Sequence, residues 1–407
     1  MPLLFSIYFN LLLSHAAGLI PFRYNFRRRC FERCAPFVPG STFLVLFFAA
    51  VQYKLGRLPE RMKIPKVGMQ DIIHAVENLV LNGNCVLIAV QQLLFLETYR
   101  QLLNELLENA PTWSRRVRTG RNRTEQLQVI LQLVLLPCSV YLLHVFVYLV
   151  LIEWADVNIA HAALFMVSLI PNMAHVNNFY AMLFVQRLTL GEINDQLTNL
   201  WTAICIRDTG GPAGEPPLPV PSCRRLQGHL AAYQQCAGAV RNILRFYSLP
   251  VALYLLILFQ ELMSKFFYQF THFYTILHGN NSLHELEVMG TLMIVVYGLD
   301  TALLISNCYG ISEQSEKIKS SVHRLSLIPG QDKHFQRTVE TFLLSLNHSM
   351  LKINIAGLFT MDFELLTGMV AAISNIVVLL MQFHIDYSHS KISYWQENNT
   401  THSLHSG

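Results

Sequence analysis

Four residues near the C-terminal end lie at spacings that place them on one face of a helix. Asn375, Leu379, Gln382 and Asp386 are separated by 4, 3 and 4 positions, and residues three or four apart are neighbours on a helix surface. Amide oxygens can replace water around a partly dehydrated cation, carboxylates concentrate cations, and leucines can form a dewetting constriction. Phe383 is the neighbouring candidate for a hydrophobic gate. The alternative for the polar members is a hydrogen bond to an adjacent helix.

A carboxylate within an apolar segment is the second chemical feature. Asp300 lies in the run TLMIVVYGLDTALLI, where an ionisable group is costly and is by default a functional candidate. A structural hydrogen bond is an equal alternative. Glu261 and Lys265 are four residues apart, so they are expected to form an ion pair along one helix.

Composition points to a membrane protein. Of the 407 residues, 52% are hydrophobic and 14% are charged, against about 25% charged residues in a typical soluble chain. This much apolar surface exceeds what a soluble core of this length hides, so lipid is the expected solvent. The net charge of +4 is small and the basic clusters have no interleaved aromatic residues, which argues against nucleic acid.

Seven segments are long enough for helices that cross about 30 Å of hydrocarbon. A spanning segment must satisfy its own backbone, and no alternating pattern of barrel strands occurs, so the expected class is an all-α membrane protein. The seven segments lie near 37–53 (the weakest), 72–96, 126–152, 160–186, 246–272, 286–310 and 366–384.

Basic residues define the expected orientation. Of the Lys and Arg residues, 22 lie on the side that holds the N-terminus and six on the other side, five of them in the first loop. Because cytoplasmic loops are enriched in Lys and Arg, we expect the N-terminus inside and the C-terminus outside. The resulting organisation is a cytoplasmic segment 1–36, a seven-helix domain 37–384 with a Pro/Gly-rich cytoplasmic loop at 188–245, and an extracellular tail 385–407.

The first twenty residues leave three alternatives open. Their apolar stretch ends in small residues, but nothing basic precedes it, which a signal peptide would require. An amphipathic helix or a re-entrant segment is therefore favoured over a cleaved signal.

Three glycosylation sequons and all the cysteines are compatible with this topology. The sequons at Asn280, Asn398 and Asn399 are external in this arrangement. No cysteine lies in an external loop, so no disulfide framework is expected. Cys30 and Cys34 lack companion ligands, which favours membrane-adjacent, palmitoylated thiols over a zinc site.

The sequence gives no support to an enzyme. HExxH, paired CxxC, phosphate-binding glycine loops and G-x-S-x-G do not occur, and no two carboxylates are arranged for acid and base chemistry. We therefore expect no catalytic residues, no metal site and no cofactor.

The C-terminal stretch LKINIAGLFTMDFELLTGMVAAISNIVVLLMQF (351–383) resembles the signature of insect gustatory receptors, which are related to insect odorant receptors. Asn375 and Ile376 stand where the family has Thr and Tyr, and GLIPF (18–22) is similar to a Gly-x-x-Pro piece ahead of the family's first span. The matching positions are Ala356, Gly357, Leu358, Phe359, Asp362, the run 376–381, Gln382 and Phe383.

This resemblance implies a subunit of a ligand-gated, nonselective cation channel in the plasma membrane of sensory neurons. The implied assembly is a homotetramer, or a heterotetramer with related subunits, whose seventh helices line one central pore. The implied ligand is an extracellular small-molecule tastant, with bitter compounds as the default. Val377 stands where sugar-sensing members carry Glu, which lowers the expectation of a sugar.

The resemblance also implies a ligand pocket among spans two to six, open to the outer side. His74, Glu77 and Asn78 follow an i, i+3, i+4 pattern and share a face. The candidate pocket residues are His74, Glu77, Asn78, Trp154, His161, Gln260, Glu261 and Asp300.

Two other membrane classes remain as alternatives. A G-protein-coupled receptor has the opposite orientation, and its acidic-Arg-Tyr and Asn-Pro-x-x-Tyr motifs are missing. A multipass solute transporter is less favoured because no internal repeat is found.

Overall fold

A computed structural model describes most of the chain. It covers residues 2–51 (except 26, 29, 34–39, 41, 44, 45 and 49), 69–117, 123–155, 159–210, 220–277, 284–328, 332–348 and 351–404. The weakest predicted span, 37–53, lies largely outside these ranges.

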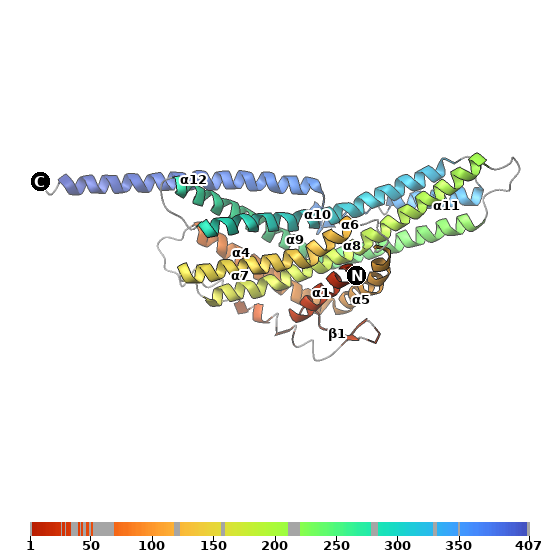
Figure 1. Ribbon diagram of the computed structural model, residues 1–407, viewed down its shortest axis with the longest axis horizontal. Coiled ribbons are helices and arrows are strands. Elements are labelled where there is room, and N and C mark those ends of the chain that lie inside the picture. Colours follow the sequence, from red (N-terminus) through yellow and green to blue (C-terminus); the bar gives the residue numbers. More distant parts are fainter. Residues whose placement is uncertain are drawn as a thin grey trace.

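The described chain is almost entirely helical, and its long helices run side by side (Figure 1). Two small antiparallel hairpins interrupt the helices, one near the N-terminus and one before the last helix. The helices are α1 (Pro2–Ala16), α4 (Met69–Leu94), α5 (Leu96–Val117), α6 (Arg123–Ile130), the π-helix η1 (Leu131–Leu135), α7 (Leu136–Ala155), α8 (Ile159–Gly210), α9 (Val220–Leu277), α10 (His284–Ser326), α11 (Lys333–His348) and α12 (Phe363–Leu404). The strands are β1 (Phe22–Asn25), β2 (Cys30–Arg33), β3 (Asn354–Ile355) and β4 (Phe359–Thr360).

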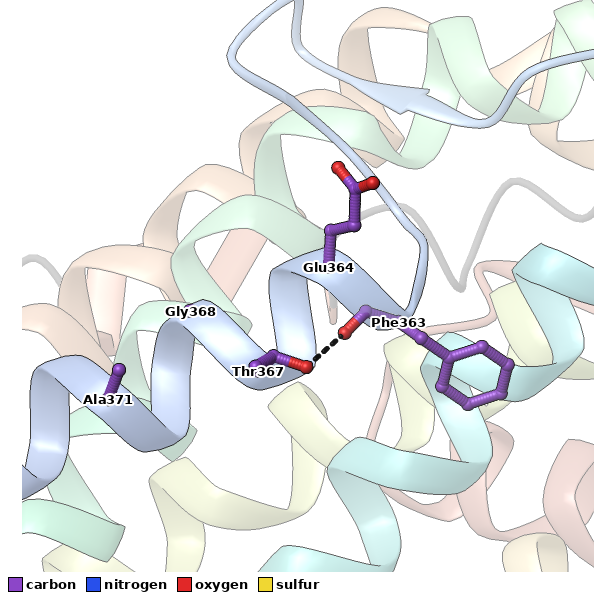
Figure 2. A pocket seen from close by; sticks show the side chains of 5 residues that line it. All are labelled: Phe363, Glu364, Thr367, Gly368 and Ala371. Carbon is purple, nitrogen blue, oxygen red and sulfur yellow. Dashed lines mark hydrogen bonds between the residues drawn. The ribbon is translucent and has the colours of Figure 1, made fainter.

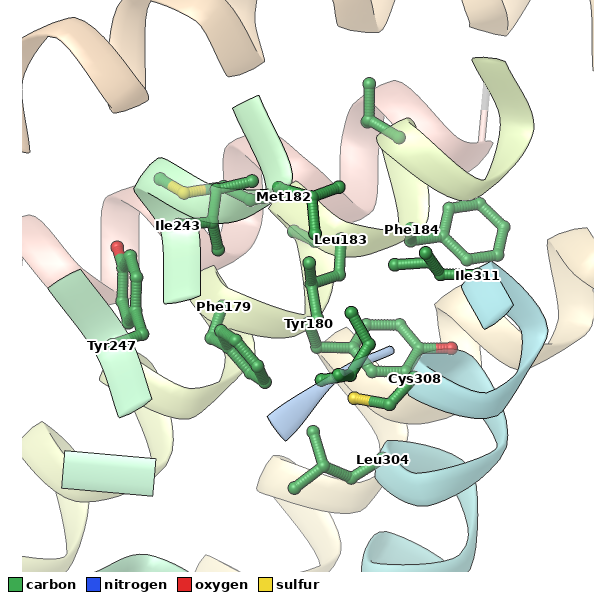
Figure 3. Close-up of a cluster of buried hydrophobic side chains, with 14 of the residues drawn as sticks. Phe179, Tyr180, Met182, Leu183, Phe184, Ile243, Tyr247, Leu304, Cys308 and Ile311 are labelled. Carbon is green, nitrogen blue, oxygen red and sulfur yellow. The ribbon is translucent and has the colours of Figure 1, made fainter. Parts of the chain in front are cut away.

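Helix α8 lies at the centre of the bundle. All of its side chains from 171 to 186 are buried, and it packs against α1, α4, α5, α7, α9 and α10. Figure 3 shows Phe179, Tyr180 and Leu183 within the core, which also includes Tyr247 of α9 and Leu304 of α10. A helix shielded on all sides by protein need not present an apolar surface to lipid.

Amide side chains satisfy the backbone where proline interrupts α9. Pro250 has no N–H, which leaves the carbonyl of Phe246 without its helical partner. The Gln91 amide of α4 donates to that carbonyl, and Asn84 Nδ2 donates to the carbonyl of Pro250 at 3.1 Å. The polar residues of α4 therefore stabilise its contact with α9.

The first helix is docked on α8 through polar side chains. Asn10 Nδ2 donates to Asn178 Oδ1 at 2.7 Å, and Asn178 Nδ2 donates to Ser14 Oγ at 3.0 Å. All three residues are buried. Of the conformations considered for the first twenty residues, the structure shows a helix, α1.

Four helices are long and apolar enough to cross a membrane over their described residues, and a fifth span is possible if α4 and α5 count as one bent pair. The four are Gln126–Val147, Cys223–Thr271, Val288–Ser326 and Phe363–Phe383, and the pair is bent by 91°. The segment predicted at 160–186 is not among them: within α8 it carries Asn172, His175, Asn177 and Asn178, all buried by protein. The all-α class is confirmed, whereas the count of seven spans and the orientation stay predictions.

Helices continue well beyond several of the predicted spans. Most of the predicted loop at 188–245 is helix, since α8 runs to Gly210 and α9 starts at Val220. The predicted tail at 385–407 is helical as far as Leu404, and this end of α12 projects beyond the other helices (Figure 1).

A tight turn joins β3 to β4 directly before α12. The N–H of Leu358 donates to the carbonyl of Ile355 at 2.9 Å, and the two residues between them, Ala356 and Gly357, have φ of 52° and 74°. Positive φ at both central positions is the geometry of a type I′ hairpin turn. The Ala-Gly pair of the C-terminal signature therefore has a structural role.

Candidate functional site

Helix α12 presents two different faces. Ile373 and Val377 are buried against the rest of the bundle, where α12 packs on α9 and α10. Asn375, Leu379 and Gln382 are exposed and lie on the opposite side. The structure thus brings these three residues together on one outward face, as their spacing predicts.

An open hollow of about 410 Å³ lies along the first turns of α12 (Figure 2). It is lined by Phe363, Glu364, Thr367, Gly368 and Ala371. The hydroxyl of Thr367 donates to the carbonyl of Phe363 at 2.9 Å, so it is satisfied within its own helix.

The hollow and the outward face of α12 form one stripe. Glu364, Gly368, Ala371 and Asn375 follow one another at spacings of 4, 3 and 4, so they share a helix face. Such spacing is typical of a helix that packs along its length against other helices. We call the residues 364, 368, 371, 375, 379 and 382 the α12 stripe.

The start of α12 is fixed by local contacts. Asp362 Oδ1 accepts the N–H of Leu365 at 3.1 Å, which is the geometry of an N-cap. The ring of Phe363 packs on Tyr309 of α10 with 4.8 Å between centroids. Asp362 thus caps the N-terminus of α12, and Glu364, two residues further on, is exposed.

Asp300 is the centre of a buried polar cluster between α9, α10 and η1. Its side chain is 2% exposed. Oδ2 accepts the hydroxyl of Tyr254 at 2.7 Å, and Oδ1 accepts the amide of Gln132. Both oxygens of the Asp300 carboxylate thus have hydrogen-bond donors, as the structural alternative requires. Gln132 lies in the π-helix Leu131–Leu135, a rare local form that often occurs at functional sites.

Other predicted pocket residues are more scattered. Lys265 Nζ lies 3.3 Å from Glu261 Oε2, so the predicted ion pair is present. Asn78 and Gln260 are buried, on α4 and α9. The side chains of His74, Glu77, Trp154, His161 and Asp386, the loop residue Asn280, and the side chains of Asn398 and Asn399 lie outside the described part of the structure.

Tyr254 and Gln132 were missed by sequence reasoning. Tyr254 is hidden within an apolar run, and an aromatic residue there is an ordinary core residue. Gln132 gave a signal, since it is an amide within the apolar run VILQLVLL. Over the described residues, no group of His, Cys, Asp and Glu side chains is placed to hold a metal ion.

A family model described as 7tm Chemosensory receptor matches residues 7–387. The chain belongs to this chemosensory receptor family. The receptor is thereby placed among multipass membrane chemoreceptors, and the match favours a receptor over an enzyme. A direct comparison with curated protein sequences finds no significant match.

Solved structures share the receptor's fold. The insect olfactory receptor OR5 from Machilis hrabei aligns with 92% of this chain and 97% of its own, at 12% identity and a TM-score of 0.58. The same olfactory receptor in complex with eugenol aligns with 93% of this chain and 97% of its own, at 13% identity and a TM-score of 0.62. The likeness extends over nearly the whole length of both chains.

Proposed function

We propose that this receptor is a gustatory-receptor-like subunit of a ligand-gated, nonselective cation channel. In this proposal four copies surround one pore, and the stripe of each α12 faces the axis. The channel lies in the plasma membrane of sensory neurons, with the N-terminus inside and the C-terminus outside, and an extracellular small molecule opens it. A bitter compound is the default ligand.

The outward position of the α12 stripe is the observation that carries the proposal. Asn375 and Gln382 are exposed on the side of α12 that faces away from its own bundle. Amides facing hydrocarbon would lack hydrogen-bond partners, which is costly. Water in a pore, or amides of neighbouring copies, would satisfy them.

The small residues at the N-terminal end of the α12 stripe would let several copies approach closely. Gly368 and Ala371 are small and exposed, and a Cβ added at Gly368 would meet nothing within 4 Å. Small residues let membrane helices approach closely. Larger residues follow toward Gln382, where Leu379 is 50% exposed and Phe383 is 59% exposed. These two apolar side chains fit a constriction that gates by excluding water.

A small organic ligand agrees with the family and the fold. The related olfactory receptor OR5 was solved in complex with eugenol. For this receptor, we place the ligand among α4, α7, α8, α9 and α10, near Asn78, Gln260 and the cluster around Asp300.

The test is Gln382→Ala in receptors recorded by patch clamp. We expect altered single-channel conductance or relative permeability, because the substitution removes one amide per subunit from the pore wall. The matched control is Ser374→Ala: Ser374 is also exposed on α12, but it lies off the stripe and its hydroxyl donates to the carbonyl of Val370 at 2.9 Å. Unchanged conductance and permeability in surface-expressed Gln382→Ala channels would remove Gln382 from the pore.

A further inference from the structure

A second hollow lies between α8 and α9, far from α12 along both helices. Its volume is about 460 Å³, within the roughly 300–1,000 Å³ of small-molecule sites. Its lining residues are Gln196, Asn199, Leu200, Ala203, Arg225, Gly228 and His229.

The two helices present matching faces to this hollow. Arg225, Gly228 and His229 lie within one turn of α9 and share a face. Below them, Leu197 of α8 and Leu226 of α9 are fully buried, which holds the two helices together. A Cβ at Gly228 would meet nothing within 4 Å, so the missing side chain leaves space for a ligand.

The polar side chains that line the hollow offer hydrogen-bond donors, and Arg225 adds a positive charge. Among the side chains that the structure describes, none forms an ion pair with Arg225, and no carboxylate is among those that line the hollow. Asn199 adds an amide, while the Gln196 amide donates to Glu192 at 2.8 Å and keeps a second N–H.

The hollow lies well outside the apolar part of α9. The last charged residue before the apolar run is Arg245, and His229 lies 17 residues before Phe246. At 1.5 Å per residue this is about 25 Å along the helix. With the bilayer edge at the predicted span near 246–272, this distance favours a ligand from solution over a lipid headgroup.

We propose that this hollow binds a soluble small molecule that carries phosphate groups. The planar guanidinium of Arg225 can donate two parallel hydrogen bonds to phosphate oxygens, and Asn199 and His229 supply further donors. The site is distinct from the pore and from the ligand region around Asp300. It goes beyond the proposed channel function and does not depend on it.

The experiment measures binding of tritiated inositol trisphosphate to the purified full-length receptor in detergent. We expect saturable binding to one site per chain. Arg225→Gln should weaken it about tenfold or more, because a charge-assisted hydrogen bond is lost. Gly228→Leu should abolish it by filling the hollow while every charge is kept.

The matched control is Arg224→Gln, which removes the same charge from the adjacent position; both arginines are exposed, but only Arg225 lines the hollow. Its effect should stay below about threefold, as for a screened surface charge. All variants must elute from a sizing column as the parent does.

A second arm uses lipid nanodiscs that contain phosphatidylinositol bisphosphate, which carries the same headgroup within a bilayer. Three results would overturn the proposal: no saturable binding of inositol trisphosphate, equal losses for Arg224→Gln and Arg225→Gln, or binding to the nanodiscs alone.

Discussion

Single buried polar residues determine how this receptor's helices fit together. Asp300 would be very costly within the bundle if it stood alone, but Tyr254 and Gln132 donate to its two oxygens. Asn84 and Gln91 similarly complete the hydrogen bonds of α9 around Pro250. These residues link helices that are distant in sequence, so they specify the arrangement of the bundle.

The Asp300 cluster makes a prediction at this scale. Asp300→Asn keeps the shape of the side chain, but its N–H₂ group replaces one carboxylate oxygen. That group then faces the donor of Tyr254 or Gln132, so one of the two hydrogen bonds is lost. We expect a cost of about 1–3 kcal/mol, measured as a lower melting temperature of the purified receptor. The control is Asp332→Asn at an exposed position, which should change little. Unaltered melting together with a lost ligand response would show instead that Asp300 serves the ligand.

At the scale of elements, the short hairpin before α12 sets where the last helix begins. Its turn requires two successive residues with positive φ, Ala356 and Gly357. The N–H of Met361 then donates to the carbonyl of Ile353 at 2.8 Å, and Asp362 caps the helix. A change of turn type would shift the start of α12 and with it the direction of the stripe.

Gly357→Val tests the role of this turn. A β-branched residue is disfavoured at a φ of 74°, at a cost of roughly 1–2 kcal/mol or more. We expect lower thermal stability of the purified receptor and less protein at the cell surface. Ala356→Gly in the same turn relieves the same kind of strain and should be neutral or slightly stabilising. The turn would be unimportant if Gly357→Val melted and trafficked as the parent does.

At the scale of the whole molecule, α12 stands at the edge of its own bundle. One side of α12 is buried by α9 and α10, and on the other side Asn375, Leu379 and Gln382 are exposed. In the proposed channel, further copies around an axis would cover this surface, and the peripheral helix α12 of each protomer would become central in the assembly.

Thiol cross-linking tests this assembly. In membranes, Asn375→Cys should give covalent dimers with bismaleimides of increasing length, above the background of the native cysteines, because the stripes of adjacent copies face one axis. Val377→Cys is the control, since position 377 is 6% exposed within its own protomer and should give no added product. Absence of added dimers at every linker length, with full thiol labelling of Asn375→Cys, would contradict the assembly.

Composition and periodicity by themselves determined the class of the protein. Long apolar segments predicted an all-α membrane chain, and the spacing of Asn375, Leu379 and Gln382 predicted their common face. The pairing of Glu261 with Lys265 also followed from spacing. These features are local, since helix geometry relates residues three and four apart without reference to the rest of the chain.

Only the tertiary structure decided the contacts between distant segments. The sequence could not show that Gln132 and Tyr254 meet at Asp300, or that α1 is docked on Asn178, because these contacts depend on how helices pack. The central position of α8 explains why its amides are tolerated: surrounding protein, rather than lipid, covers them. Likewise, the outward direction of the α12 stripe follows from which side α9 and α10 bury, and helix periodicity alone does not specify that side.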